Sequence, residues 1–395
     1  MQAQPFEIAV PDAVLDDLQR RLEHARLPHD FANDDWAYGT NGAYLRDLVG
    51  HWRDRYDWRA RERAMNALHH FRVELDGVLI HFVHERGRGP DPVPIVLSHG
   101  WPWTFWDYRH LVGPLTDPAA HGGDPADSFD VVVPSLPGFA FSTPLTRTGV
   151  NAWTTADLWA TLMTDVLGYD RFGAAGGDWG SLTTAQLGHK YADRLVGIYL
   201  TQIGATLDLF GNDRPWDPFA EFVAPLTGRE RAEFIDWERR FASHVCVQVL
   251  DPETLSYAMH DSPVGMAAWL VERRRAWSDC GGDVERRFTK DELLDHVMLY
   301  WATEAFVTSV RFYAEAARFT WTPSHDRTPV VEAPTGYTIF TPDAIALSSD
   351  WVPGYFNVCF ANERHAGGHF APAEEPAAVV EDLRATFRPL RAGRS

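Results

Sequence analysis

The stretch FGAAGGDWG, residues 172–180, decides the fold class of this sequence. Its first four residues form a short apolar run typical of a buried strand, and an amphipathic segment follows at 180–191. The small residues between the two favour a sharp turn that pushes one side chain into a cleft, a nucleophile elbow. The residue at the tip is Asp178, and the sequence contains no Gly-x-Ser-x-Gly motif. We therefore expect a carboxylate, rather than a serine hydroxyl, at the reacting position.

Short apolar runs alternate with longer amphipathic segments on both sides of this stretch. The runs lie at 95–97, 131–133, 172–175 and 196–200, and the amphipathic segments lie at 105–115, 154–167 and 180–191. This alternation favours an α/β fold with a mostly parallel sheet that is covered by helices. A period of two at 71–83, with a turn at Asp76-Gly77, predicts a β-hairpin ahead of the sheet. Strand signals return at 338–340 and 356–360, before a last helix at about 375–387.

Two regions lie outside this alternation. Residues 205–320 carry helical segments around 228–243, 252–260, 263–277 and 290–317, so we expect an inserted helical lid over the carboxyl ends of the strands. The N-terminal region begins with a helix between Pro11 and Pro28 and continues with a tryptophan-rich stretch and a second helix around 44–52. We therefore predict an N-terminal wrapping domain at 1–75, an α/β core at 76–204, the lid at 205–321 and the rest of the core at 322–395.

The composition restricts the class of protein. The 395 residues include 36 basic and 55 acidic side chains with a formal charge of −19, so binding to nucleic acid or to an anionic membrane surface is not expected. The three cysteines are far apart and odd in number, and no apolar run approaches about 18 residues. Without a signal peptide at its start, the chain is expected to be soluble and cytoplasmic. The composition leaves open whether the chain forms a homo-oligomer.

No metal or cofactor is expected. His81 and His84 are three residues apart on a predicted strand, so they point to opposite faces, and no carboxylate or cysteine cluster joins them. We predict structural roles for both histidines.

A carboxylate at the elbow predicts displacement at carbon followed by ester hydrolysis. An aspartate with a pKa near 4 is already ionised at neutral pH, and its attack on a saturated carbon leaves an ester that water can cleave. A serine attacking the same carbon would leave an ether, which water does not easily cleave. An aspartate just before a helix also fits a helix cap. On this stretch alone, both roles remain open for Asp178.

A second turn supplies donors for a developing oxyanion. His99-Gly100-Trp101-Pro102 follows the strand at 95–97 and precedes a helix. A backbone N–H from this position, together with the N–H of the residue after the nucleophile, stabilises the oxyanion in hydrolase folds. We therefore expect Trp101 and Trp179 to form the oxyanion hole.

A third turn carries the base. Gly367-Gly368-His369-Phe370 lies between the last strand and the last helix, where a histidine activates water in the chain order nucleophile, acid, histidine. The acid that orients His369 should lie between the other two. Asp343 is the first choice, with Asp350 and Glu363 as the alternatives.

These motifs together resemble the α/β-hydrolase-fold epoxide hydrolases of the microsomal type. The likeness spans nearly the whole chain, including the epoxide hydrolase N-terminal domain. We do not expect the N-terminal membrane anchor of the animal relatives in this chain, and we therefore predict a soluble, bacterial-type enzyme. The matching motifs are VPD at 10–12, YDWR at 56–59, HGWP at 99–102, PSLPG at 134–138, GGDWG at 176–180, DSPVG at 261–265, RFY at 311–313 and GGHF at 367–370.

The resemblance implies a pair of lid tyrosines that bind and protonate the epoxide oxygen. One position corresponds to Tyr313, but His244 stands where the second tyrosine is expected. Either His244 donates in its place, or Tyr313 works alone, or Tyr257 reaches in from a nearby helix. If His244 is the donor, ring opening should weaken as the pH rises through about 6.5, where imidazole titrates.

The acid also departs from the family pattern Phe-Pro-x-Glu. The corresponding segment here is Phe340-Thr341-Pro342-Asp343, with the proline shifted by one position and a shorter carboxylate. Asp343 stays the first choice.

The expected activity is the conversion of an apolar epoxide and water to a vicinal diol through an ester on Asp178. The 16 tryptophans and 23 phenylalanines favour an aromatic pocket, and hence an aryl or alkyl epoxide. A haloalkane dehalogenase uses the same carboxylate chemistry and is one alternative. A binding protein for lipophilic ligands that has lost turnover is the other.

Overall fold

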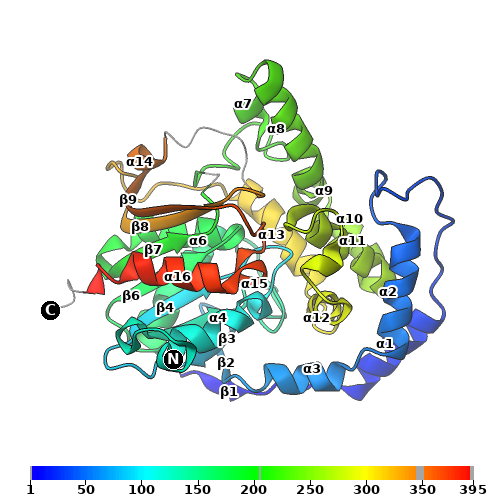
Figure 1. The fold of residues 1–395 in the computed structure, drawn as a ribbon, viewed down its shortest axis with the longest axis horizontal. Coiled ribbons are helices and arrows are strands. Elements are labelled where there is room, and N and C mark those ends of the chain that lie inside the picture. Colours follow the sequence, from blue (N-terminus) through cyan, green and yellow to red (C-terminus); the bar gives the residue numbers. More distant parts are fainter. Residues whose placement is uncertain (1, 204–205, 344–350, 392–395) are drawn as a thin grey trace.

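The computed structural model describes residues 2–203, 206–343 and 351–391. Within them, nine strands form one sheet in the order β1-β2-β3-β5-β4-β6-β7-β8-β9 (Figure 1). The strands are β1 (Gln4–Phe6), β2 (His70–Leu75), β3 (Val78–Glu85), β4 (Val93–Ser98), β5 (Phe129–Pro134), β6 (Phe172–Gly176), β7 (Leu195–Leu200), β8 (Val331–Phe340) and β9 (Phe356–Arg364).

The sheet is mostly parallel, as the alternation of strand and helix signals predicts. β1, β2, β3 and β5 pair antiparallel in turn, whereas every pair from β5 through β4, β6, β7 and β8 to β9 is parallel. The carboxyl ends of β4, β6, β7, β8 and β9 therefore meet at one edge of the sheet, where ligands bind in open α/β folds. The predicted fold class is confirmed.

Helices cover both faces of this sheet. α4 (Arg109–Thr116) packs with α16 (Pro376–Phe387) on one face, and α5 (Ala152–Thr161) packs with α6 (Trp179–Lys190) on the other (Figure 1). A short turn of 3₁₀ helix, η1 (Phe105–Tyr108), precedes α4. α6 begins so close to the end of β4 that a Cβ on Gly180 would overlap the carbonyl oxygen of Ser98. This close approach sets the start of α6, and with it the elbow, against the end of β4.

The segment between β7 and β8 is helical, as predicted. The expected single helix at 290–317 is instead two helices, because the backbone takes a left-handed conformation at Glu304, with φ 55°. No Gly or Pro marks this break in residues 302–305, so the sequence gives no signal for it. The helices are α7 (Ala220–Val223), α8 (Gly228–Phe241), α9 (Ser243–Leu250), α10 (Pro252–Asp261), α11 (Pro263–Trp277), α12 (Lys290–Trp301) and α13 (Phe306–Arg318).

The N-terminal region lies against this helical insertion. Its helices are α1 (Asp12–Glu23), α2 (Gly42–Asp54) and α3 (Trp58–Met65), and β1 adds an unpredicted edge strand to the sheet. The Asp295 carboxylate on α12 accepts hydrogen bonds from Tyr56 and Arg61, which joins the two regions. The four-segment division stays a prediction, since β2 lies before the expected boundary at residue 75 and pairs with β3 beyond it.

Two further short α-helices flank the last strand. α14 (Val352–Tyr355) precedes β9, and α15 (Ala371–Glu374) lies directly before α16. None of the helices formed by the described residues combines the length and the apolar character that crossing a membrane requires.

Candidate active site

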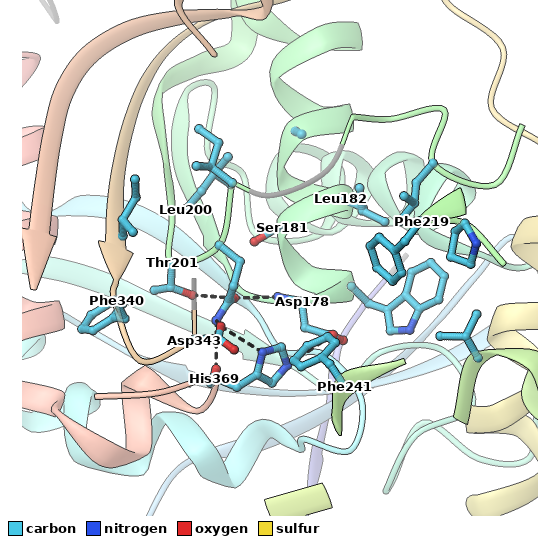
Figure 2. A pocket seen from close by; sticks show the side chains of 18 of the residues that line it. Asp178, Ser181, Leu182, Leu200, Thr201, Phe219, Phe241, Phe340, Asp343 and His369 are labelled. Carbon is cyan, nitrogen blue, oxygen red and sulfur yellow. Dashed lines mark hydrogen bonds and ion pairs between the residues drawn. The ribbon is translucent and has the colours of Figure 1, made fainter. Parts of the chain in front are cut away.

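The turn between β6 and α6 presents Asp178 in a strained backbone conformation. Its φ is 53° and its ψ is −125°, a region that non-glycine residues rarely adopt and that costs free energy unless the surroundings enforce it. The side chain makes no capping hydrogen bond to α6, so the helix-cap role is not what the structure shows. Asp178 instead lines a cavity (Figure 2).

One oxygen of the Asp178 carboxylate is held by the loop after β4. The backbone N–H of Trp101 donates to Oδ1 of Asp178 at 2.8 Å. A Cβ on Gly100 would overlap the Asp178 side chain, so only glycine lets this loop come so close. Trp179 is the first residue of α6, directly after Asp178.

The other oxygen faces His369. Nε2 of His369 lies 3.3 Å from Oδ2 of Asp178, and Nδ1 lies 3.1 Å from Oδ2 of Asp343. The structure therefore brings together the three side chains that the chain order predicts (Figure 2). Of the two alternative acids, Asp350 lies outside the described residues. Glu363 is an exposed residue of β9, 3.6 Å from the ring of His365.

The two carboxylates set the charge of His369. Burial disfavours the imidazolium, but the charges of Asp343 and Asp178 and their hydrogen bonds outweigh it and raise the pKa of His369 to about 9. At neutral pH the free protein therefore holds His369 as an imidazolium between two carboxylates.

Hydrogen bonds fix the loop that carries His369. All four backbone N–H groups of residues 367–370 have acceptors in the structure. Gly367 donates to the Asp279 carboxylate at 3.1 Å, His369 donates to the carbonyl of Trp277 at 2.9 Å, and residues 368 and 370 each donate to the Glu374 carboxylate at 3.0 Å. Burial raises the pKa of Glu374 to about 7. Sequence reasoning missed Glu374, because a single glutamate near a helix start carries no motif.

The helical insertion contributes the second group of polar side chains. Nε2 of His244, on α9, lies 3.0 Å from the hydroxyl of Tyr313, on α13. Nδ1 of His244 lies 3.0 Å from the carbonyl oxygen of Phe241, which can only accept, so Nδ1 carries the proton. In a neutral imidazole Nε2 then has a free lone pair, and it accepts from the Tyr313 hydroxyl. Tyr257 is 80% exposed on α10 and does not line the cavity.

Burial keeps His244 neutral. It lowers the pKa of His244 well below the ordinary value near 6.5, and the positive charge of Arg273 acts in the same direction. The low pKa of His244 counts against a titration of ring opening near pH 6.5, because this environment disfavours the imidazolium. Burial and the charge of Asp178 raise the pKa of Tyr313, so its hydroxyl keeps its proton at neutral pH.

Aromatic rings fix this pair in place. The ring of Trp101 stacks on His244 with centroids 5.0 Å apart and planes 13° apart, and the ring of Trp179 meets Tyr313 edge-on at 4.7 Å. Trp277 touches both histidines, with its ring centroid 4.9 Å from His244 and 5.1 Å from His369. Several aromatic contacts thus join the insertion to the core loops.

The cavity is small and mostly apolar. It has a volume of about 210 Å³ and opens beside Asp178, His369, Tyr313 and His244. Apolar side chains from the core and the insertion make up most of its wall, among them Leu182, Phe210, Phe219, Trp237, Val245 and Phe356 (Figure 2).

Among 2–203, 206–343 and 351–391, no group of three or more His, Cys, Asp or Glu side chains is placed to hold a metal ion. His81 lies 2.9 Å from the Ser135 hydroxyl, and His84 lies 3.0 Å from the hydroxyl of Tyr169. Each of these histidines thus has a separate polar partner.

The fold and the site define an α/β hydrolase whose elbow carries a carboxylate. The sequence model of the family described as "Epoxide hydrolase N terminus" matches residues 3–108, and that of the family described as "alpha/beta hydrolase fold" matches residues 93–241. A protein of Stigmatella aurantiaca named "Putative epoxide hydrolase" is 38% identical over 98% of this chain and 85% of its own length.

Two further comparisons agree. Epoxide hydrolase 1 of Sus scrofa is 30% identical, with 96% of this chain and 87% of that protein covered. The structure of Aspergillus niger epoxide hydrolase superposes with a TM-score of 0.81 at 25% identity, covering 99% of this chain and 97% of that one. The chain belongs to the epoxide hydrolases of the α/β-hydrolase fold, as its motifs indicate.

Proposed function

We propose that this protein hydrolyses apolar epoxides to vicinal diols through an ester on Asp178. The observation that carries the proposal is that the two oxygens of this carboxylate have different partners. Oδ1 is held by the Trp101 N–H at 2.8 Å, and Oδ2 faces His369 at 3.3 Å. One oxygen is thus placed to attack, while the other is placed to bear negative charge later.

In the first step, Oδ2 of Asp178 attacks an epoxide carbon. A new C–O bond forms, the C–O bond of the ring breaks, and its electron pair passes to the epoxide oxygen, which takes the phenolic proton of Tyr313. In the free protein the Tyr313 hydroxyl donates to Nε2 of His244 at 3.0 Å, which holds the phenol in place, and it exchanges this partner for the epoxide oxygen when substrate binds. Of the three possibilities for the proton donor, the geometry favours Tyr313 working alone.

Ester formation then changes the charge around His369. It removes the negative charge of Asp178, one of the two charges that raise the pKa of His369 to about 9. His369 then loses its proton to solvent and becomes a base, while the Tyr313 phenolate takes a proton from solvent and is restored. The first step therefore prepares the second.

In the second step, His369 takes a proton from water, which attacks the ester carbonyl. The negative charge develops on Oδ1, which the N–H groups of Trp101 and Trp179 stabilise. The glycol oxygen leaves with the proton from His369, and the acid proton of Asp178 returns to His369. Asp343 holds the imidazole throughout.

The lining favours an aryl or alkyl epoxide, because a charged substrate would lose its hydration in a cavity with few polar groups. Dehalogenation of a haloalkane needs no phenolic donor, so the Tyr313–His244 pair favours the epoxide. The retained contacts of Asp178 with His369 and Trp101 count against a binding protein without turnover. The lid role of 205–321, the cytoplasmic location, the bacterial source and the oligomeric state stay predictions.

A single turnover in ¹⁸O-labelled water tests the proposal. With enzyme in excess over styrene oxide, we expect the label in the peptide that holds Asp178 and unlabelled oxygen in the diol, because water attacks the carbonyl of the ester. The Asp178→Asn variant should neither form the ester nor incorporate label, with a loss of activity of at least about 10⁴-fold. Label in the diol during the first turnover would show direct attack of water on the epoxide and would overturn the proposal. Halide release from a chloroalkane without diol formation would favour the dehalogenase.

A further inference from the structure

Gln202 is the second residue after β7, and its side chain bonds to Asp178, Asp343 and His369 at once. Its Oε1 accepts from the backbone N–H of Asp178 at 2.8 Å, and the Thr201 hydroxyl also points to it at 3.0 Å. Its Nε2 lies 2.9 Å from the carbonyl oxygen of His369 and 3.3 Å from Oδ2 of Asp343.

The partners leave only one arrangement of the amide. A backbone N–H can only donate, so the oxygen of Gln202 must face Asp178. A carbonyl and an ionised carboxylate can only accept, so the nitrogen must face His369 and Asp343. A side chain with one accepting end and one donating end is required, and glutamine is of the right length to span the gap.

We propose that Gln202 is a positioning residue that holds the strained elbow of Asp178 and the acid Asp343 in register with His369. The inference rests on the proposed function, since it assigns separate steps to the two ends of one amide. The oxygen end supports the elbow and thereby the attack of Asp178 on the epoxide. The nitrogen end supports Asp343 and the backbone of His369, and thereby the hydrolysis of the ester.

The accepting end of the amide matters because the backbone of Asp178 is strained and depends on its contacts to keep its conformation. Its φ of 53° is held by neighbouring contacts, and the bond from its N–H to Gln202 is the contact that reaches it from β7. The acid end matters because Asp343 touches both Nδ1 of His369 and Nε2 of Gln202 through the same oxygen, Oδ2. Removing one donor frees that oxygen to turn away from the imidazole.

Two substitutions separate the ends. Gln202→Glu keeps the oxygen that accepts from Asp178 but places a second oxygen against the carboxylate of Asp343 and the carbonyl of His369. Gln202→Met keeps the length of the side chain and removes both ends. The groups that surround His369 are Asp178 and Asp343 at its two nitrogens, Glu374 in its loop, and the neutral His244 across Trp277.

Rapid quenching and mass spectrometry of the Asp178 peptide measure ester formation and ester hydrolysis separately. In Gln202→Glu we expect ester formation within about threefold of the wild type and hydrolysis slower by about 10- to 100-fold, the effect of losing a hydrogen bond to a charged group. The pH of half-maximal hydrolysis should rise, because an added negative charge favours the imidazolium of His369. In Gln202→Met both steps should slow by about tenfold or more.

A matched control separates position from charge. Gln2→Glu makes the same change at an exposed residue ahead of β1 and should leave both rates and the pH profile unchanged. The amplitude of the ester burst counts the competent molecules, so partial misfolding lowers the amplitude but not the rate constants. A merely structural role of Gln202 would lower the amplitude and the Tm only.

The inference is overturned if both variants hydrolyse the ester within twofold of the wild type and with the same pH profile, while the wild type still forms its ester. Absence of an ester in the wild type would overturn the proposed function as well. One readout needs no substrate. The pKa of His369, followed by NMR and assigned with a His369→Gln variant, should rise in Gln202→Glu, and an unchanged pKa would count against the contact with Asp343.

Discussion

Two histidines line the same cavity, yet the two regions that supply them drive their charges in opposite directions. His369 comes from a core loop and faces two carboxylates, which raise its pKa to about 9. His244 comes from the helical insertion and faces a carbonyl, a phenol and two tryptophan rings, and burial lowers its pKa well below 6.5. The residue type alone therefore does not decide the chemistry. The core loop thus holds a histidine that changes charge during the proposed reaction, whereas the insertion holds one that stays neutral and accepts a hydrogen bond.

The strongest test of this contrast is removal of the core base. His369→Gln should slow hydrolysis of the ester by about 10³-fold, because no group is left to take the proton of water. Ester formation should change far less, so the ester should accumulate and be visible in the mass of the Asp178 peptide. Rapid turnover without accumulation would show that another base serves the second step.

Removal of the insertion's proton donor should affect the other step. In Tyr313→Phe we expect ester formation to slow by about 10²-fold, because the epoxide oxygen leaves without a proton. Hydrolysis of an ester that has already formed should be unchanged. To measure it, the variant is incubated with substrate until the ester has formed and is then diluted into excess buffer, and the loss of ester is followed. Equal slowing of both steps would show that the insertion also acts on the ester.

The charge of His369 should appear in the stability of the fold. Its pKa is raised from about 6.5 in the unfolded chain to about 9 in the folded one, so the folded state binds the proton more tightly. The resulting stabilisation, at most about 3 kcal/mol, is complete below pH 6.5 and is lost as the pH rises through 9. Urea unfolding of the wild type and of His369→Gln at pH 6, 7.5 and 9 should show this difference shrinking. A constant difference would mean that His369 is neutral in the free protein.

The smallest effect is expected at His244. Ester formation by the wild type should be nearly flat between pH 6 and 8, because His244 stays neutral there. His244→Phe should slow ester formation by about tenfold at every pH, since the Tyr313 hydroxyl loses the acceptor that orients it. A rate that declines above pH 6 in the wild type, but not in the variant, would make His244 a proton donor after all.

The same contrast explains what the sequence reveals. The core site is predictable from the sequence, because Asp178, Trp101 and His369 lie in short glycine-containing turns after strands and follow the chain order of the family's catalytic residues. The chain order of the catalytic residues leaves three candidate carboxylates for the acid. Within the described residues, the distance of 3.1 Å between Nδ1 of His369 and Oδ2 of Asp343 is what identifies Asp343. The existence of the insertion is also predictable, from a long run of helical pattern between strands.

What the sequence does not reveal depends on distant partners. The neutrality of His244 results from its packing against Trp101 and Trp277, which lie in other parts of the chain. Gln202 bonds to residues that are 24, 141 and 167 positions away, so no local spacing marks it. The break between α12 and α13 is missed because its residues are ordinary helix formers.

The hydrogen bonds of the loop at 367–370 also limit how molecules enter and leave. Two of its acceptors, the carbonyl of Trp277 and the carboxylate of Asp279, belong to the end of α11 and the turn after it. If the whole insertion moved outward as one rigid body, it would break these two hydrogen bonds and displace the loop that carries His369. Any motion of the insertion that keeps His369 in place must therefore leave the end of α11 attached to this loop.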